Sequence, residues 1–289
     1  MADFAPTVRA ALDWARQRGL DRTEAQTLVL HALGKPLHAS AWLLAHGDAP
    51  LDGTTQDQLT AWVARRLASE PLAYITGRKA FYGLELAVDA RVLDPRADTE
   101  TLVDWALEVL PEAPIQRVLD LGTGSGAIAL ALQQARPHWQ IQAIDRSADA
   151  LSVARENARR LQLPVRFHEG SWLTGFAGPV DAIVSNPPYI AAADPHLAAL
   201  THEPLDALAS GADGLDDLRQ IVAAAGPCLA PRGWLLLEHG HDQAAAVRAL
   251  LQDAGFTPVQ SRRDLAGIER CSGGQYGIAT GTVAVNPND

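Results

Sequence analysis

The fold is decided by residues 117–132, which read RVLDLGTGSGAIALAL. The first five residues form an apolar run typical of a buried strand, and AIALAL is typical of a helix. Between them stand Gly122, Gly124 and Gly126. Glycine is needed where a backbone turns tightly and where a ligand approaches without a Cβ in the way. The stretch therefore predicts a strand, a ligand-binding loop and a helix, as at the carboxyl ends of strands in open α/β sheets.

Asp145 stands nineteen residues after Gly126, at the end of the next predicted strand. A carboxylate at that position is suited to accept hydrogen bonds from a ribose diol. The glycine spacing does not match the G-x-G-x-x-G pattern that holds a pyrophosphate, so a nucleoside without phosphates fits better than a dinucleotide. The alternative to a nucleoside site is a purely structural role, in which the glycines form a tight turn and the aspartate caps a helix.

Strands and helices alternate beyond Pro95. The predicted strands are 118–121, 141–145, 180–185 and 234–238, and the predicted helices are 127–135, 149–161 and 243–254. Alternation of this kind implies crossover connections and a mostly parallel sheet with helices on both faces. The predicted fold class is therefore α/β.

A second loop, Ser185-Asn186-Pro187-Pro188-Tyr189, follows the apolar strand 180–184 directly. Two consecutive prolines fix two φ angles and remove two backbone donors, so the loop is stiff and presents acceptors. The Asn186 side-chain oxygen and the Pro187 carbonyl can each accept one hydrogen of a planar NH2 group. The Tyr189 ring can pack against the plane of that group. The alternative is that Asn-Pro-Pro simply ends a strand.

The first 77 residues are helical throughout by their apolar spacing. Asp21 with Glu24 three residues on resembles a capping box and predicts a helix start. Thr55 with Gln58 repeats that signal ahead of another helix. We expect a small helical bundle here.

The amino-acid composition limits the classes of protein to which the chain can belong. The chain has 289 residues, of which 47% are hydrophobic and 20% charged, which excludes a wholly disordered chain. No apolar run is long enough to span a membrane, and the sequence begins without a signal core, so we expect no export. Cys228 and Cys271 lack metal or redox spacing and suit a reducing cytosol.

Charge is distributed unevenly. The formal net charge is -10, with +1 on residues 1–80 and -11 on the remainder. Proteins that grip nucleic acid use clustered Lys and Arg, so the acidic remainder argues against nucleic acid as the main substrate.

With these motifs, the chain resembles class I S-adenosylmethionine-dependent methyltransferases, and among them the release factor glutamine methyltransferases. The blocks that carry the resemblance are the glycine loop, Asn-Pro-Pro-Tyr-Ile, and residues 70–77, 95–100, 194–197, 203–205 and 236–240. The resemblance implies a Rossmann-like sheet of seven strands. It also implies an N-terminal helical substrate-recognition domain over 1–77, a β-hairpin linker over 78–92 and a methyltransferase domain over 93–289.

The resemblance further implies that S-adenosyl-L-methionine is the methyl donor, S-adenosyl-L-homocysteine the product, and that no metal takes part. The implied cofactor-binding residues are Gly122, Thr123, Gly124, Ser125, Gly126, Asp145, Trp172 and Asn186. The implied substrate-binding residues are Asn186, Pro187, Pro188 and Tyr189, and Asn186, Pro187 and Tyr189 are the implied catalytic ones.

The implied substrate is the glutamine of the Gly-Gly-Gln motif in peptide-chain release factors, methylated on its side-chain nitrogen N5. The resemblance implies a cytoplasmic monomer with no direct nucleic-acid or membrane partner. Three departures from the family pattern stand at Ser171, at Asp94 with Ala97, and in the short stretch 197–203.

The sequence leaves two alternative functions open. An adenine-N6 methyltransferase of nucleic acid would share Asn-Pro-Pro-Tyr, since adenine also offers a planar NH2, and a non-catalytic binding module would keep only the fold. His239 and His241 form a weak metal pair, and Glu238 is a candidate base that more plainly supports its loop. Residues 273–275 repeat Gly-Gly-Gln, which we expect to be a turn entering a terminal strand.

Overall fold

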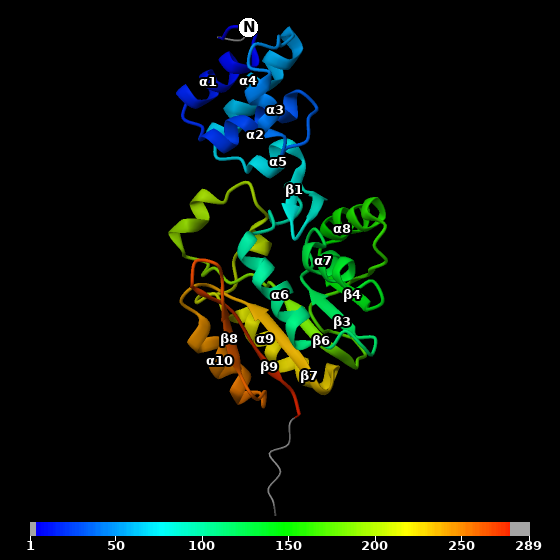
Figure 1. Ribbon diagram of the computed structural model, residues 1–289. Coiled ribbons are helices and arrows are strands. Elements are labelled where there is room, and N and C mark those ends of the chain that lie inside the picture. The colour runs from blue at the N-terminus through cyan, green and yellow to red at the C-terminus, as the bar shows by residue number, and fades with distance from the viewer. Residues whose placement is uncertain (1–3, 278–289) are drawn as a thin grey trace, which may run out of the picture. The chain divides into compact units, whose positions relative to one another are not determined.

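The chain divides into two compact units, residues 1–78 and 79–289, and the computed structural model describes residues 4–277. Figure 1 shows the helical first unit and the sheet of the second. Within residues 4–277, no helix is both long and apolar enough to cross a membrane.

Helices account for the regular structure of the first unit up to residue 77. They are α1 (Val8–Gln17), α2 (Arg22–Ala32), α3 (Ser40–Ala45), α4 (Gly53–Leu67) and α5 (Leu72–Thr76). One apolar cluster joins them, with Leu28, Val29 and Leu59 fully buried. Burial of an apolar stripe from each helix against the others stabilises a unit of this size.

The capping box predicted at Asp21 is confirmed. The Asp21 carboxylate accepts from the Glu24 N–H at 2.8 Å, and the Glu24 carboxylate accepts from the Asp21 N–H at 3.0 Å. The start predicted at Thr55 is wrong, because α4 begins at Gly53 and the Asp52 carboxylate accepts from the Thr55 N–H at 2.7 Å. Thr55 is thus the third helical residue, and the stronger acceptor three positions earlier sets the start.

We expect Asp21→Ala to lower the free energy of unfolding by about 1 kcal/mol, because the alanine leaves helix N–H groups without their acceptor. Urea denaturation followed by tryptophan fluorescence measures the change. Asp21→Asn is the matched control, since asparagine caps as well as aspartate. Equal losses in the two variants would contradict the capping role.

Residues 78–277 form two sheets. A two-stranded sheet pairs β1 (Arg78–Phe81) with β2 (Leu84–Ala87). The main sheet has seven strands in the order β5-β4-β3-β6-β7-β9-β8, which confirms the Rossmann-like expectation. Its strands are β3 (Arg117–Leu121), β4 (Gln140–Asp145), β5 (Arg166–Glu169), β6 (Val180–Ser185), β7 (Leu229–Glu238), β8 (Gln260–Arg263) and β9 (Glu269–Gln275). Strand β9 is antiparallel to both of its neighbours, whereas the pairs from β5 to β7 are parallel.

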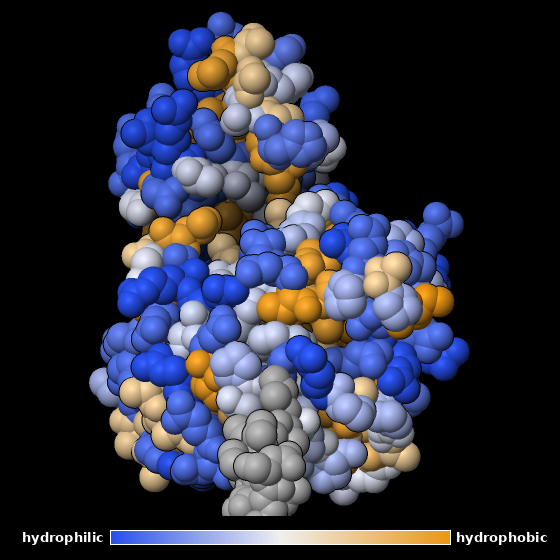
Figure 2. Space-filling model, turned by 60° about the horizontal axis from the view of Figure 1, so that its bottom comes forward, coloured by the Kyte–Doolittle hydropathy of each residue, from blue (hydrophilic) through white to orange (hydrophobic). Residues whose placement is uncertain are grey.

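Helices cover the sheet in two groups (Figure 1). The groups are α6 (Glu100–Val109), α7 (Ala127–Ala135) and α8 (Ala148–Leu161), and then α9 (Asp216–Ala225) with α10 (Ala244–Asp253). Short 3-10 turns lie at η1 (Ala97–Thr99), η2 (Pro195–Ala199), η3 (Leu205–Ala207) and η4 (Gly226–Cys228). The side of the molecule seen in Figure 2 is mostly hydrophilic, with hydrophobic residues in small separate groups, as expected when apolar strands are covered by helices.

Strand register brings the two predicted loops together. Leu121, the last residue of β3, pairs with Ile144 of β4 on one side and with Ser185 of β6 on the other. The chain runs from β3 outward to β5 and then returns to β6 beside β3, so the strand order reverses at this point. Ligands of open α/β sheets bind at such a reversal, outside the carboxyl ends of the strands.

Candidate functional site

A cavity of about 550 Å³ opens at the carboxyl ends of β3, β4 and β6. The predicted site residues that line it are Gly122, Gly124, Asp145, Trp172, Asn186 and Pro188. Thr123, Ser125, Gly126, Pro187 and Tyr189 are not among its lining residues, and all of these except Tyr189 are buried. Sequence reasoning missed the part of the wall formed by residues 91–93, 146–147, 150 and 204–207.

The glycine loop has the geometry that its sequence predicts. Gly122, Gly124 and Gly126 all have φ between 56° and 85°, a region that side chains other than glycine rarely adopt. At Gly122 a Cβ would lie 3.1 Å from the Trp172 ring, and at Gly126 one would lie 3.0 Å from a Leu130 methyl group. The loop is therefore held close to an aromatic ring on one side and to its own helix on the other.

Asp120 supports the loop from below and was not predicted as a site residue. Its carboxylate accepts from the Thr123 hydroxyl at 2.6 Å and from the Ala129 N–H at 3.3 Å. The pKa of Asp120 is raised to about 7, mainly by complete burial and also by the nearby Asp145, while its two hydrogen bonds oppose the shift. An acidic residue inside an otherwise apolar strand is the signal that could have found it.

Asp145 projects from the end of β4 with both carboxylate oxygens anchored. One oxygen accepts from the Gly124 N–H at 2.8 Å, and the other accepts from the Ser147 N–H at 2.9 Å. A carboxylate has about four acceptor positions, so lone pairs remain for a ligand diol. Trp172 is fixed at the same cavity, since its indole N–H donates to Asp217 at 3.1 Å.

The Asn-Pro-Pro-Tyr loop is anchored at both ends. Ser185 donates to the Leu121 carbonyl at 2.7 Å, and the Asn186 side-chain nitrogen donates to the Thr99 hydroxyl at 3.1 Å. Farther along, the Tyr189 carbonyl accepts from the Gln243 side chain at 3.0 Å. The amide oxygen of Asn186 is thereby directed away from Thr99, because the two ends of the amide point in different directions.

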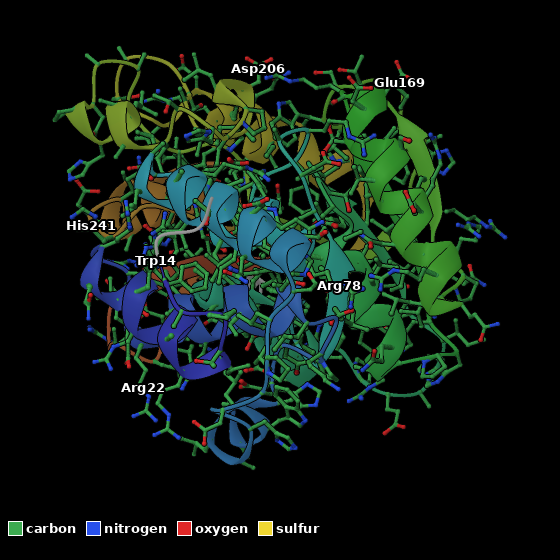
Figure 3. All side chains as sticks on the ribbon, turned by 90° about the horizontal axis from the view of Figure 1, so that it is seen from above. Trp14, Arg22, Arg78, Glu169, Asp206 and His241 are labelled. Atoms are coloured by element: carbon green, nitrogen blue, oxygen red, sulfur yellow. The ribbon has the colours of Figure 1, made fainter. Side chains whose placement is uncertain are left out.

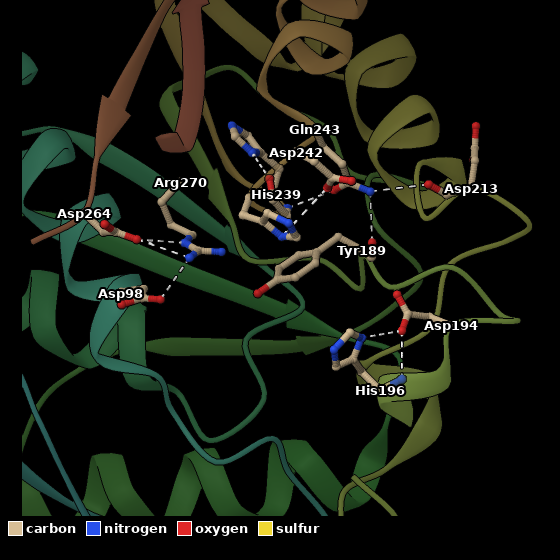
Figure 4. A network of polar contacts seen from close by, with 12 residues as sticks. Asp98, Tyr189, Asp194, His196, Asp213, His239, Asp242, Gln243, Asp264 and Arg270 are labelled. Carbon is tan, nitrogen blue, oxygen red and sulfur yellow. Dashed lines mark hydrogen bonds and ion pairs between the residues drawn. The ribbon is translucent and has the colours of Figure 1, made fainter. Parts of the chain in front are cut away.

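Buried charges lie behind this loop. The Tyr189 hydroxyl donates to the Glu238 carboxylate at 3.3 Å, and Glu238 is fully buried. Burial raises the pKa of Glu238 to about 7, against the opposing effects of Thr99, Arg270 and Tyr189. Figure 4 shows Arg270 between Asp98 and Asp264, at 3.3 Å and 3.2 Å, with the Tyr189 hydroxyl pointing toward this group. Burial and the Glu238 charge also raise the pKa of Tyr189.

Asp94, which departs from the family pattern, is held by ion pairs with nearby basic side chains. Asp94 pairs with Lys79 at 3.0 Å and with Arg96 at 3.6 Å, and Arg96 pairs with the buried Glu203 at 2.5 Å. These charges tie the segment before α6 to the 190–215 segment. Asp206 of that segment lies at the edge of the second unit (Figure 3), where it pairs with Arg146 at 3.1 Å.

Two weaker motifs have structural roles. His239 is buried and bonded to Gly240 and Ser272, whereas the His241 side chain is exposed (Figure 3), and residues 4–277 contain no group of three candidate metal ligands. Residues 273–275 lie in β9, where a Cβ on Gly273 would meet the Leu235 carbonyl at 2.5 Å. The internal Gly-Gly-Gln is therefore part of a close-packed strand, in which Gln275 pairs with Trp234, and the turn expected here is wrong.

Comparisons with known proteins cover nearly the whole chain. The family model "Methyltransferase small domain" matches residues 98–213, and "PrmC N-terminal domain" matches residues 10–77. A release factor glutamine methyltransferase of Xylella fastidiosa is 47% identical over 274 residues, covering 93% of this chain and 98% of the relative. The protein of the same name from Burkholderia pseudomallei is 46% identical, with 93% and 97% covered.

Solved structures share the fold at low identity. A methyltransferase from Pyrococcus furiosus has a TM-score of 0.53 at 20% identity and covers 74% of this chain and 98% of its own. The hMettl16 catalytic domain in complex with MAT2A 3'UTR hairpin 1 has a TM-score of 0.56 at 13% identity, with 81% and 85% covered.

We expect Arg96→Ala to lower the free energy of unfolding by about 1–3 kcal/mol, because it leaves the buried Glu203 carboxylate without its positively charged partner and with only the Asp94 N–H as a donor. Arg91→Ala, which breaks the exposed pair with Asp89, is the matched control and changes stability by less than about 0.5 kcal/mol. Urea denaturation compares the two variants. A loss in Arg91→Ala as large as in Arg96→Ala would refute the role assigned to Glu203.

Proposed function

The chain belongs to the release factor glutamine methyltransferase family, and we propose that Asn186 marks the point where its methyl donor and its glutamine substrate meet. The reaction is transfer of a methyl group to the side-chain amide nitrogen of a release factor glutamine, in the Gly-Gly-Gln motif. The observation that carries the assignment is the orientation of Asn186. This residue lines the cavity, and its nitrogen is held by Thr99, which leaves its oxygen for a substrate NH2.

S-adenosyl-L-methionine is the proposed methyl donor, and the cavity suits it. A volume of about 550 Å³ is that of a small-molecule site. Gly122 and Gly124 let a ligand approach the backbone, the Asp145 carboxylate suits a ribose diol, and Trp172 offers a face for adenine. When bound, the donor supplies an electrophilic methyl group on a sulfonium. Thr123, Ser125 and Gly126 fit a role in holding the loop, with Ser171 at the rim.

The proposed reaction depends more on orientation of the substrate amide than on a general base. An amide nitrogen attacks poorly because its lone pair is delocalised into the carbonyl. Asn186 Oδ1 and the Pro187 carbonyl would each accept one amide hydrogen, hold the nitrogen in line with the methyl group and stabilise its developing positive charge. In favourable cases, orientation of this kind lowers the activation free energy by about 7 kcal/mol or more. Pro188 and Tyr189 would keep the loop rigid and pack against the amide plane, and the proton leaves to water.

The finer assignments are proposals of the same kind. Residues 1–77 are proposed to recognise the substrate, with residues 78–92 as a linker to a methyltransferase domain at 93–289. The release factor is the proposed partner. A monomeric state, a cytoplasmic location, the absence of a metal and the absence of a direct nucleic-acid contact stay predictions.

The direct test incubates the full chain with labelled S-adenosylmethionine and a release factor carrying Gly-Gly-Gln or Gly-Gly-Ala. We expect label only in the Gly-Gly-Gln form, because alanine has no side-chain nitrogen. Duplex DNA and RNA serve as controls for adenine methylation. Equal labelling of the two release factor forms, or labelling of nucleic acid alone, would overturn the proposal.

Asn186→Ala is expected to lower kcat by about 100-fold or more, because it removes an acceptor aimed at developing charge. The donor Kd, measured by calorimetry, separates this effect from lost binding. Abundant turnover by the variant with unchanged donor affinity would exclude the acceptor role.

Asp145→Ala is expected to weaken donor binding by about 10- to 100-fold, since hydrogen bonds to a charged group contribute about 1.5–3 kcal/mol. Asp149→Ala, an exposed acid in the first turn of α8, is the matched control and leaves the Kd nearly unchanged. If both variants bind the donor alike, Asp145 does not contact it.

A further inference from the structure

Trp172 lines the cavity in a strained backbone conformation. Its φ is 49°, in the left-handed region that bulky side chains rarely adopt. A Cβ on Gly122 would lie 3.1 Å from the Trp172 ring, so the ring rests directly on the glycine loop. The indole N–H donates to the Asp217 carboxylate at 3.1 Å. A hydrogen bond at the edge of the ring fixes which way its face points, so Asp217 orients this wall of the cavity.

The segment that carries Asp217 starts beside the Asn-Pro-Pro-Tyr loop, and we call residues 208–217 the brace. It runs parallel to the residue that follows that loop. The Ile190 N–H donates to the Leu208 carbonyl at 2.9 Å, and the Ser210 N–H donates to the Ile190 carbonyl at 2.9 Å. The buried Ser210 hydroxyl then accepts from the Asp217 N–H at 2.8 Å. Hydrogen bonds thus connect the loop to the residue that holds Trp172.

The middle of the brace is in close contact with the same loop. A Cβ on Gly214 would lie 2.2 Å from the Tyr189 carbonyl oxygen, so the two backbones approach more closely than a side chain allows. The Gln243 side chain donates to the Tyr189 carbonyl at 3.0 Å and to the Asp213 carbonyl at 3.4 Å (Figure 4). Gln243 therefore fastens the loop to the brace.

We propose that the brace positions both sides of the site, through Asp217 for the methyl donor and through Gln243 for the substrate. Neither side chain lines the cavity, so each acts through the residue that it holds. This inference rests on the proposed function and adds to it the residues that keep donor and glutamine in one geometry. In-line transfer is sensitive to that geometry, since a displacement of about 1 Å can lower the rate by about 100-fold.

The donor side is tested by the Kd for S-adenosylmethionine, measured by calorimetry on the full chain. Asp217→Ala is expected to weaken binding by about 3- to 10-fold, because the ring loses its fixed orientation. Trp172→Phe keeps an aromatic face without the N–H, so adding Asp217→Ala to it is expected to change the Kd little further. Asp217→Asn keeps an acceptor oxygen and recovers most of the affinity. Asp216→Ala, which removes the neighbouring acid that pairs with Arg219 at 2.9 Å, is the matched control and leaves the Kd nearly unchanged.

The substrate side is tested by kcat for release factor methylation at saturating donor. Gln243→Glu keeps the length of the side chain and the acceptor for the Gly240 N–H, but it sets an oxygen against the Tyr189 and Asp213 carbonyls. We expect kcat to fall about 10- to 100-fold while the donor Kd stays nearly unchanged. Gln220→Glu makes the same substitution at an exposed position of α9 and is expected to leave both quantities nearly unchanged.

The opposite results overturn the inference. It fails if Asp217→Ala weakens donor binding by the same factor with and without Trp172→Phe, or if Asp217→Asn is as impaired as Asp217→Ala. It also fails if Gln243→Glu keeps its kcat, or loses donor binding to the same extent, as a purely structural role would require. Failure of the proposed function looks different, because the unaltered chain would then not bind the donor or not distinguish Gly-Gly-Gln from Gly-Gly-Ala.

Discussion

Leu121 is hydrogen-bonded into the sheet on both sides, and the site depends on that register. Its partners, Ile144 and Ser185, are the residues just before Asp145 and Asn186. A parallel sheet aligns the carboxyl ends of its strands, so three loops that are far apart in sequence begin at one level. The Ser185 hydroxyl, donating to the Leu121 carbonyl, adds a side-chain bond to the same junction. A slip by one residue would turn Asn186 and Asp145 to the other faces of their strands.

The second constraint is electrostatic. Arg270, whose side chain is 13% exposed, pairs with Asp98 and Asp264, and its charge also opposes the raised pKa of the buried Glu238. Charges in a poorly hydrated interior are tolerated when they are paired and hydrogen-bonded. Charged groups come from η1 before α6, from β7 and from β9. Because β9 runs antiparallel beside β7, Arg270 and Cys271 lie behind the Asn-Pro-Pro-Tyr loop. The sheet order thus serves the chemistry as well as the core.

Local patterns predicted much of this arrangement, and long-range contacts account for what they missed. The alternating strands and helices, the glycine loop, the capping box at Asp21 and the stiff Asn-Pro-Pro-Tyr loop are all set by residues near one another in sequence. Strand β5, with only four residues and little burial, carries no apolar run by which to recognise it. The contact between Asn186 and Thr99 spans 87 residues, and nothing in either segment reveals it. Asp52 was passed over because a weaker capping signal at Thr55 lay within the same turn.

The proposed reaction accounts for a site without an obvious base. A glutamine amide keeps its hydrogens at neutral pH, and its nitrogen gains acidity only as the methyl bond forms. Early removal of a proton therefore contributes little, and acceptors that are in place beforehand contribute more. An asparagine side chain is a good acceptor of this kind only when its orientation is fixed, since its two ends have nearly the same shape and opposite polarity. The hydrogen bond from the Asn186 side-chain nitrogen to the Thr99 hydroxyl is the contact that orients this amide.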